Sequence, residues 1–238
     1  MKKNKNNILC VISARGDSQG LKDKNIKKFN GKPLIAWTIL QAKRSKFIND
    51  IYVSTDSLKI AKIAESYGAK IPFLRKKKYS TKTISKFLVW KDALEKIEKI
   101  YNQNYDFYLD LDCTNPLRSS YDIDQMCKSY FKNKNFYDGI YTIAEARKNP
   151  YFNIIEYRNK NLEISKKLES WPTSRQSAPK VYDQVASMYL FKSRFIKKNY
   201  SMYQGKICGF ELKDYQNFDI DSPLDFFIIE KLFKKFYL

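Results

Sequence analysis

The sequence predicts an α/β fold in which a doubly wound, mostly parallel sheet carries helices on both faces. The run from Ile8 to Ile12 is apolar without alternation, which suits a strand buried on both faces. Strand-like segments at 51–56 and 105–112 then alternate with segments of helical periodicity, as in a βαβ series. The chain has 238 residues and 43% hydrophobic content, enough to bury the core of one such domain.

The other elements follow from local signals in chain order. Pro33 suits the first turn of a helix, and Gly68 suits the C-terminal end of the next helix. The apolar stripe of residues 87–101 predicts a helix packed on the core, with no cofactor role. Further extended segments are expected at residues 71–75, 139–146, 188–191 and 206–212, and further helices at residues 122–131 and after Asp221.

Residues 147–172 interrupt this pattern. The segment is rich in aromatic residues, with turn signals at Asn149 and Pro150 and around Asn159. It predicts a hairpin-like insertion, which on its residues alone could be a surface flap. We therefore expect a single domain, 1–238, with this segment inserted in it.

Charge and composition restrict the class of function. The formal net charge is +20, a balance that suits nucleic acid or a membrane surface. The lysines are spread over helix faces, however, and the densest run, Lys76 to Lys78, is short. We therefore attribute the net charge to a general bias of the composition toward lysine and expect no nucleic-acid partner. Because no apolar run approaches the roughly 18 residues of a membrane helix and no signal peptide precedes the first strand, we expect a cytoplasmic protein without a membrane partner.

The residue types also restrict the chemistry. The chain has no histidine, and its four cysteines are scattered without a C-x-x-C pair. Free buried thiols are expected, and any metal must be held by oxygen, which favours Mg²⁺ over zinc or copper. The commonest general base is missing as well.

A polar, basic loop follows the first predicted strand. In an open α/β sheet, ligands bind off the carboxyl ends of the strands, where this loop lies. Its glycines let backbone N–H groups approach a polyanion, and Arg15 and Lys24 can pair with phosphate oxygens. The loop lacks the P-loop and dinucleotide-binding signatures. The residues alone thus allow either a triphosphate-binding loop or an ordinary polar turn.

Two D-x-D pairs lie near predicted extended segments. Asp110 and Asp112 end the strand at 105–112, and Asp219 and Asp221 precede the last helix. Side chains two positions apart in an extended chain point the same way, so such a pair can offer two carboxylates to one Mg²⁺ ion. Without further context, a helix-capping aspartate and a surface aspartate are the more common explanation of such a pair.

Several blocks together resemble a known family over nearly the whole chain. They are A-R-G-x-S-x-G-L-x-x-K-N from Ala14, V-S-T-D from Val53, F-L-R from Phe73, P-L-R from Pro116, S-R-Q-x-x-P-K-V-Y from Ser174 and F-D-I-D-S-P-L-D-F from Phe218. In this order they resemble the CMP-sugar synthetases, the acylneuraminate cytidylyltransferase family. The resemblance implies a Rossmann-like nucleotidyltransferase sheet and a homodimer. It also implies that residues 147–172 form a dimerisation arm that reaches the partner subunit's site.

The resemblance also implies a set of site residues. The catalytic residues would be Arg15, Lys24 and Asp221, and the Mg²⁺ ligands Asp219 and Asp221. The nucleotide-binding residues would be Ala14, Arg15, Gly16, Ser18, Lys24, Asn25, Arg75 and Ser85, and the sugar-binding residues Asp112, Arg175 and Gln176.

The implied reaction is attack by the anomeric hydroxyl of a nonulosonic acid on the α-phosphate of CTP, which gives a CMP-sugar and pyrophosphate. Two alternatives stay open. One is a related nucleotidyltransferase acting on another sugar acid, such as Kdo. The other is a catalytically weakened paralogue that only binds nucleotide.

Three positions depart from the family pattern. Gln19, preceded by Asp17, stands where the family usually has lysine, which removes one phosphate-directed cation. Asp112 stands where many members have glutamine, and Val185 where asparagine is common. A carboxylate at position 112 only accepts hydrogen bonds, which favours a substrate with amide N–H groups. We therefore hypothesise a di-N-acylated nonulosonic acid, such as legionaminic or pseudaminic acid.

Overall fold

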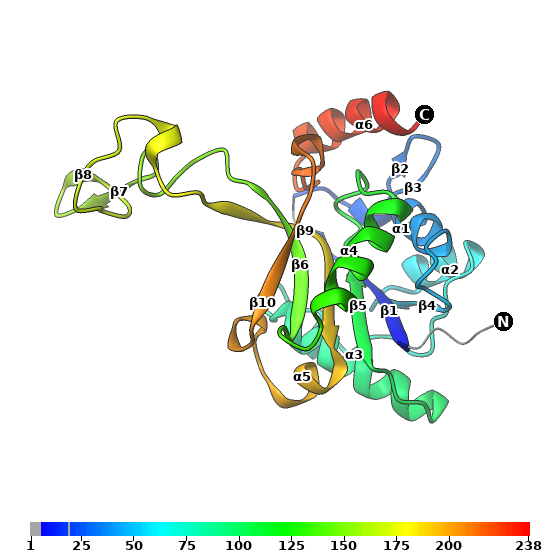
Figure 1. Ribbon diagram of the computed structural model, residues 1–238. Helices are drawn as coiled ribbons and strands as arrows, with labels where there is room; N and C mark the ends of the chain where they lie inside the picture. The colour runs from blue at the N-terminus through cyan, green and yellow to red at the C-terminus, as the bar shows by residue number, and fades with distance from the viewer. Residues whose placement is uncertain (1–5, 19) are drawn as a thin grey trace.

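The computed structural model describes residues 6–18 and 20–238, so Gln19 lies outside the described residues. A six-stranded sheet forms the centre of the chain, in the order β10-β6-β9-β5-β1-β4 (Figure 1). Its strands are β1 (Ile8–Ser13), β4 (Ile51–Ser54), β5 (Phe107–Leu111), β6 (Gly139–Glu145), β9 (Tyr182–Lys192) and β10 (Ile207–Glu211). β1 pairs parallel to β4 and β5, and β10 pairs parallel to β6, whereas β9 runs antiparallel between β5 and β6. The expected mostly parallel sheet is confirmed, with one antiparallel strand that the sequence did not predict.

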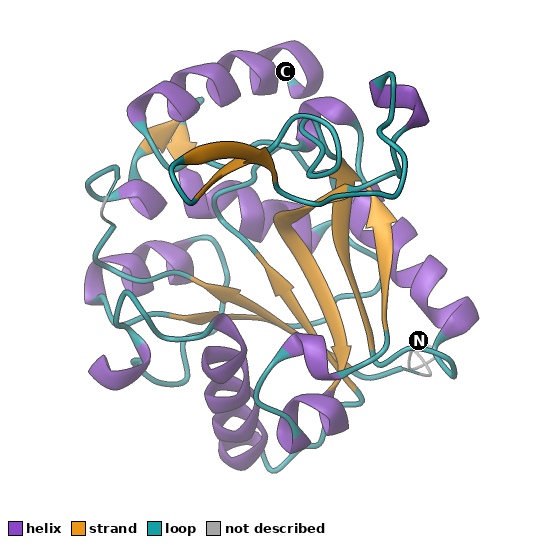
Figure 2. Ribbon diagram, turned by 90° about the vertical axis from the view of Figure 1, so that its left-hand side faces the viewer, coloured by secondary structure: helices purple, strands orange, loops and turns teal. Residues whose placement is uncertain are grey.

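Helices cover both faces of this sheet, as expected of a doubly wound fold (Figure 1 and Figure 2). They are α1 (Leu34–Lys43), α2 (Leu58–Ser66), α3 (Lys86–Tyr101), α4 (Ser120–Asn133), α5 (Ser193–Lys198) and α6 (Pro223–Tyr237). The buried run in β1 explains the two layers, because its side chains alternate between faces. Cys10 and Ile12 belong to the core beneath α1, α2 and α4, and Leu9 and Val11 belong to the core beneath α3 and α5.

A smaller core joins the two ends of the chain. Leu21 from the loop after β1 and Ile220 from the segment before α6 are both buried, together with Phe233 of α6. The Phe233 ring also packs against Phe29, with 5.2 Å between ring centroids. α6 begins with a capping box in which Ser222 and Asp225 satisfy each other's backbone N–H groups. The C-terminal segment is therefore held beside the N-terminal loop by apolar packing and a well-defined helix start.

The predicted insertion contains a two-stranded hairpin, β7 (Ile155–Arg158) and β8 (Asn161–Ile164). It lies away from the central sheet, at the end of chain segments that continue β6 and β9 (Figure 1). Its turn residues Asn159 and Lys160 both have positive φ, which agrees with the turn expected there. The role of this hairpin in dimerisation stays a prediction.

Some elements were predicted only in part or were not predicted from the sequence. The strand expected at 188–191 is the eleven-residue β9, whose first residues, Tyr182 to Gln184, are exposed and carry no apolar pattern. The segment expected at 71–75 forms one isolated bridge to the edge of the sheet, between Leu74 and Thr55. The helix α5 and the short ribbon of β2 (Lys28–Phe29) and β3 (Lys32–Pro33) were not predicted. Within residues 6–18 and 20–238, no helix has the length and apolarity required to cross a membrane.

Candidate active site

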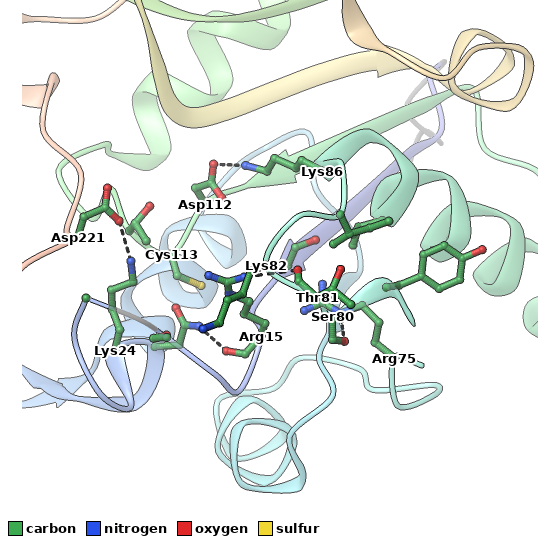
Figure 3. A pocket seen from close by; sticks show the side chains of 18 residues that line it. Arg15, Lys24, Arg75, Ser80, Thr81, Lys82, Lys86, Asp112, Cys113 and Asp221 are labelled. Carbon is green, nitrogen blue, oxygen red and sulfur yellow. Dashed lines mark hydrogen bonds and ion pairs between the residues drawn. The ribbon is translucent and has the colours of Figure 1, made fainter. Parts of the chain in front are cut away.

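A cavity of about 530 Å³ opens at the carboxyl ends of β1 and β5 (Figure 3). This is the switch point of the sheet, because the chain leaves β1 toward β4 on one side and later returns to β5 on the other. Four segments form its wall: the loop after β1, the loop before α3 with the first turn of that helix, the residues after β5, and Asp221 before α6. The lining residues are Ser13, Arg15, Ser18, Gly20, Lys24, Asn25, Arg75, Tyr79, Ser80, Thr81, Lys82, Ile84, Lys86, Val89, Asp112, Cys113, Thr114 and Asp221.

The N-terminal loop and the C-terminal aspartate meet in this cavity. Lys24 Nζ lies 2.9 Å from Asp221 Oδ1 and donates a second hydrogen bond to the Ile220 carbonyl at 2.7 Å (Figure 3). The approach is so close that a Cβ atom on Gly20 would lie 1.9 Å from the Asp221 carbonyl oxygen. Only glycine is compatible with that backbone contact.

The loop is held in shape by its own chain. Asn25 donates from its side-chain amide to the Arg15 carbonyl at 3.0 Å, and the Gly16 N–H donates to Asp56 Oδ1 at 2.8 Å. The Ala14 N–H donates to the Ser54 carbonyl at 3.0 Å. Neither Ala14 nor Gly16 is among the described residues that line the cavity. Their N–H groups fix the loop, while the side chains of Arg15, Ser18 and Lys24 reach the cavity.

The segment before α3 forms the opposite wall. Arg75 is 6% exposed, and its Nε donates to Ser80 Oγ at 3.2 Å. Arg15 Nη1 donates to the Thr81 carbonyl at 3.5 Å, which joins the two loops across the cavity. Ser85, predicted to bind nucleotide, is exposed at the start of α3 and is not among the described lining residues. The lining residues Tyr79 to Lys82 were missed, because the sequence shows there only a polar, basic stretch.

Asp219, two residues before Asp221, is half-buried and is not among the described residues that line the cavity. Burial, followed by the negative charges of Asp112 and Asp221, raises the pKa of Asp219 to about 7. In the described part of the chain its buried Oδ1 atom has no hydrogen-bond partner. A buried carboxylate oxygen without a partner, next to a more exposed carboxylate, fits a site for a hard cation.

The protein's own ligands would be few. Within the described ranges, no three or more Asp, Glu, Cys or His side chains are grouped to hold a metal. A cation on Asp219 and Asp221 would need further oxygens, which Mg²⁺ commonly takes from water and substrate phosphates.

A second charged cluster, centred on Lys86, was not predicted. Lys86 Nζ hydrogen-bonds Asp112 Oδ2 (Figure 3). It also lies 3.1 Å from Asp110 Oδ2. Burial opposes its charge, but the two carboxylates outweigh burial and raise the pKa of Lys86 above its usual value. The D-x-D spacing at the end of β5 was visible in the sequence, but a lysine at the start of a helix resembles any surface lysine.

Arg118 binds the backbone of the same region. It is fully buried, and its Nη1 donates to the carbonyls of Asp112 at 2.6 Å and Asn115 at 2.8 Å. Its role is therefore to fix the backbone that follows β5.

Arg175 and Gln176 lie elsewhere. Within the described residues they line a separate cavity of about 410 Å³ at the base of the insertion, where Arg175 Nη2 donates to the Ala146 carbonyl at 2.7 Å. Val185 is buried in the sheet core and is also absent from the lining of the first cavity. Of the three predicted sugar-binding residues, one chain thus brings only Asp112 into the cavity.

The doubly wound sheet, with a cationic loop after its first strand and carboxylates across the crevice, defines the chain as an α/β nucleotidyltransferase. A family model described as cytidylyltransferase matches residues 9–235, and the chain belongs to this family. The predicted resemblance is thereby confirmed.

Proteins with similar sequences match nearly the whole chain. The sequence is 44% identical over 229 residues to post-translational flagellin modification protein B of Campylobacter coli, covering 96% of this chain and 95% of that protein. It is 43% identical over 226 residues to a CMP-N,N'-diacetyllegionaminic acid synthase of Campylobacter jejuni, covering 94% of each chain. The fold is similar to that of a CMP:2-keto-3-deoxy-manno-octonic acid synthetase complexed with CTP, with a TM-score of 0.70 at 14% identity, covering 96% of this chain and 99% of that one.

Proposed function

We propose that this protein transfers CMP from CTP to the anomeric hydroxyl of a nonulosonic acid and releases pyrophosphate. The observation that carries the proposal is the contact of Lys24 with Asp221, because it brings the cationic loop and one carboxylate of the acidic pair to one cavity. Transfer to an α-phosphate depends on placing the reactants and neutralising charge more than on covalent help from the protein.

The triphosphate is assigned to the loop after β1. The Arg15 guanidinium can pair with two phosphate oxygens, and Lys24 provides a point charge beside it. Lys24 is ion-paired with Asp221, so the pyrophosphate leaving group would compete with that carboxylate for the ammonium. Ser18 and Arg75 line the same cavity and complete the polar surface around the phosphates.

Mg²⁺ is assigned to Asp219 and Asp221. The support is the unpartnered, buried Oδ1 atom of Asp219 together with the exposed Asp221 carboxylate. When bound, Mg²⁺ neutralises phosphate charge and lowers the pKa of a coordinated hydroxyl, so a histidine base is not required.

The acceptor is assigned to the di-N-acylated nonulosonic acids. A relative that is 43% identical is named as a synthase of CMP-N,N'-diacetyllegionaminic acid. Asp112 supports the same class, because it lines the cavity and a carboxylate accepts hydrogen bonds from amide N–H groups.

The hairpin of β7 and β8 is assigned to a homodimer contact. Tyr157 and Leu162 of this hairpin are 79% and 56% exposed, and Trp171 nearby is 61% exposed. Apolar side chains gathered on a protruding hairpin are typical of an interaction surface. Arg175 and Gln176, at the base of the insertion, are then assigned to the sugar site of the partner subunit.

One assay tests the proposal. The protein is incubated with CTP, Mg²⁺ and a panel of 2-keto sugar acids, and products are identified by mass spectrometry. We expect a CMP conjugate of a di-N-acylated nonulosonic acid and one pyrophosphate per conjugate. Tight, steeply salt-dependent binding to nucleic acid without sugar-dependent pyrophosphate release would contradict the proposal and favour a binding module.

A further inference from the structure

We propose that Lys86 is a positioning residue for the sugar acid. It holds the Asp112 carboxylate at the cavity wall, where that carboxylate can accept hydrogen bonds from N–H or O–H groups of the sugar acid. This inference rests on the proposed function. It adds a residue outside the predicted site and states how that residue acts through Asp112.

The geometry places one ammonium between two carboxylates. Lys86 comes from the first turn of α3, whereas Asp110 and Asp112 come from the end of β5. The side chain of Asp110 is fully buried, that of Asp112 is 13% exposed, and that of Lys86 is 30% exposed. Lys86 Nζ also lies 4.4 Å from the centroid of the Tyr189 ring, which closes it in from β9. The ammonium is therefore held between two carboxylates and an aromatic ring.

Asp112 is fixed at both its backbone and its side chain. Its N–H donates to the Ser187 carbonyl at 3.0 Å, and its own carbonyl accepts from Arg118 at 2.6 Å. The carboxylate is the part that the backbone leaves free to rotate, and Lys86 binds one of its oxygens. Removing Lys86 would therefore free the carboxylate while the backbone stays in place.

The carboxylate at the cavity wall favours a neutral donor. Lys86 and the buried Arg118 both lie near Asp110 and Asp112, and Asp112 is the carboxylate of the two that lines the cavity, where it offers hydrogen-bond acceptors and no donor. A phosphate or carboxylate group of a ligand would be repelled there, whereas an amide N–H or a hydroxyl would be bound.

Lys86 itself is unsuited to bind the triphosphate. Its ammonium is already shared by two carboxylates, whereas Arg15 has no carboxylate partner in the described part of the chain and donates only a 3.5 Å bond to a backbone carbonyl. We therefore expect the phosphates of CTP to bind at Arg15 and the sugar acid to bind at the wall formed by Asp112.

The experiment is steady-state kinetics of Lys86→Met with a di-N-acylated nonulosonic acid. Met keeps the length of the side chain and removes the charge. We expect KM for the sugar acid to rise by roughly tenfold, with KM for CTP within about twofold of the parent value. Adding Asp112→Asn to Lys86→Met should cause little further loss, because the two residues act as one unit. Lys99→Met, an exposed lysine on the same helix, is the matched control and should behave as the parent.

A second variant tests the inference if Lys86→Met fails to fold. Lys86→Met leaves the buried Asp110 without its cation, so Lys86→Met/Asp110→Asn removes both charges and still frees Asp112. The same rise in KM for the sugar acid is expected there. An unchanged KM for the sugar acid, an equal rise in KM for CTP, or a changed Mg²⁺ requirement alone would each overturn the inference. If the parent protein forms no conjugate with any sugar acid, the proposed function fails instead.

Discussion

Lys24 and Asp221 stand 197 positions apart in the chain, yet the Lys24 ammonium and the Asp221 carboxylate form a 2.9 Å ion pair. The pair is supported by the Gly20 backbone against the Asp221 carbonyl and by Leu21 packed with Ile220. The cavity therefore depends on the docking of two distant segments, and changes at this junction should alter turnover more than folding.

Asp221→Ala should lower turnover by on the order of 100-fold or more, because the variant loses a carboxylate assigned to Mg²⁺. CTP should still bind, since Arg15, Ser18 and Arg75 remain in the cavity. Pyrophosphate release measures turnover, and calorimetry measures CTP binding. Asp214→Ala, an exposed aspartate outside the described cavity, serves as the control. Full activity in Asp221→Ala would defeat the assignment.

Gly20→Ala should abolish most activity and also lower the free energy of unfolding, because the two segments share the buried side chains of Leu21 and Ile220. The added methyl group would lie 1.9 Å from a backbone oxygen, so the loop and the C-terminal segment must separate. Gly31→Ala gives the contrast. Gly31 has φ +86° and no atom within 4 Å of an added Cβ, so this variant should lose about 1 kcal/mol of unfolding free energy but keep its turnover. Urea denaturation measures stability and initial rates measure turnover. If both variants changed the rate equally, the contact of Gly20 with Asp221 would not be required for activity.

Tyr157→Ser with Leu162→Ser should shift the protein from dimer to monomer. Both side chains are exposed on the hairpin and would lose apolar contact with a partner. Light scattering after size exclusion measures the mass. Tyr121→Ser, at a tyrosine that is 68% exposed on α4, is the matched control. If the parent protein is itself monomeric, the dimer proposal is wrong.

Arg175→Ala and Asp221→Ala should complement each other when mixed. If Arg175 serves the cavity of the partner subunit, a mixed dimer contains one intact site, and part of the activity should return after subunit exchange. A mixture as inactive as its two components, with exchange demonstrated, would assign Arg175 to its own chain.

Asp219→Asn should stabilise the protein at neutral and higher pH when Mg²⁺ is absent. Burial raises the pKa of Asp219 from 3.8 to about 7, so the folded chain holds a proton that the unfolded chain has lost. Stability therefore falls as pH rises between these two values, and the amide removes this loss. We expect a gain on the order of 2 kcal/mol near pH 8 and a much smaller one near pH 4.5, measured by urea denaturation with a chelator. Equal gains at both pH values would contradict the assignment.

Much of the fold was predictable because local signals agree with the tertiary structure. The unalternating run in β1 is buried on both faces, and Gly68 ends its helix with φ +88°. β9 was predicted only in part, because its first residues leave the sheet toward the insertion and carry no apolar pattern. Its antiparallel direction follows from the insertion between β6 and β9, which no local signal specifies.

The position of a site residue was predictable where it depends on its own loop. Arg15, Ser18, Lys24, Asn25 and Arg75 all line the cavity, and their contacts with a nucleotide stay a prediction. The position of Lys86 depends instead on the packing of α3 against β5, which brings it to Asp110 and Asp112. Sequence spacing cannot reveal such a contact between distant segments.

The contact of Gly20 with Asp221 also sets an order of events during synthesis. All six strands of the sheet precede residue 221 in the chain, so they are synthesised before the segment that completes the cavity. A chain truncated just before residue 221 would keep every strand of the sheet and lack the Asp221 wall of the cavity.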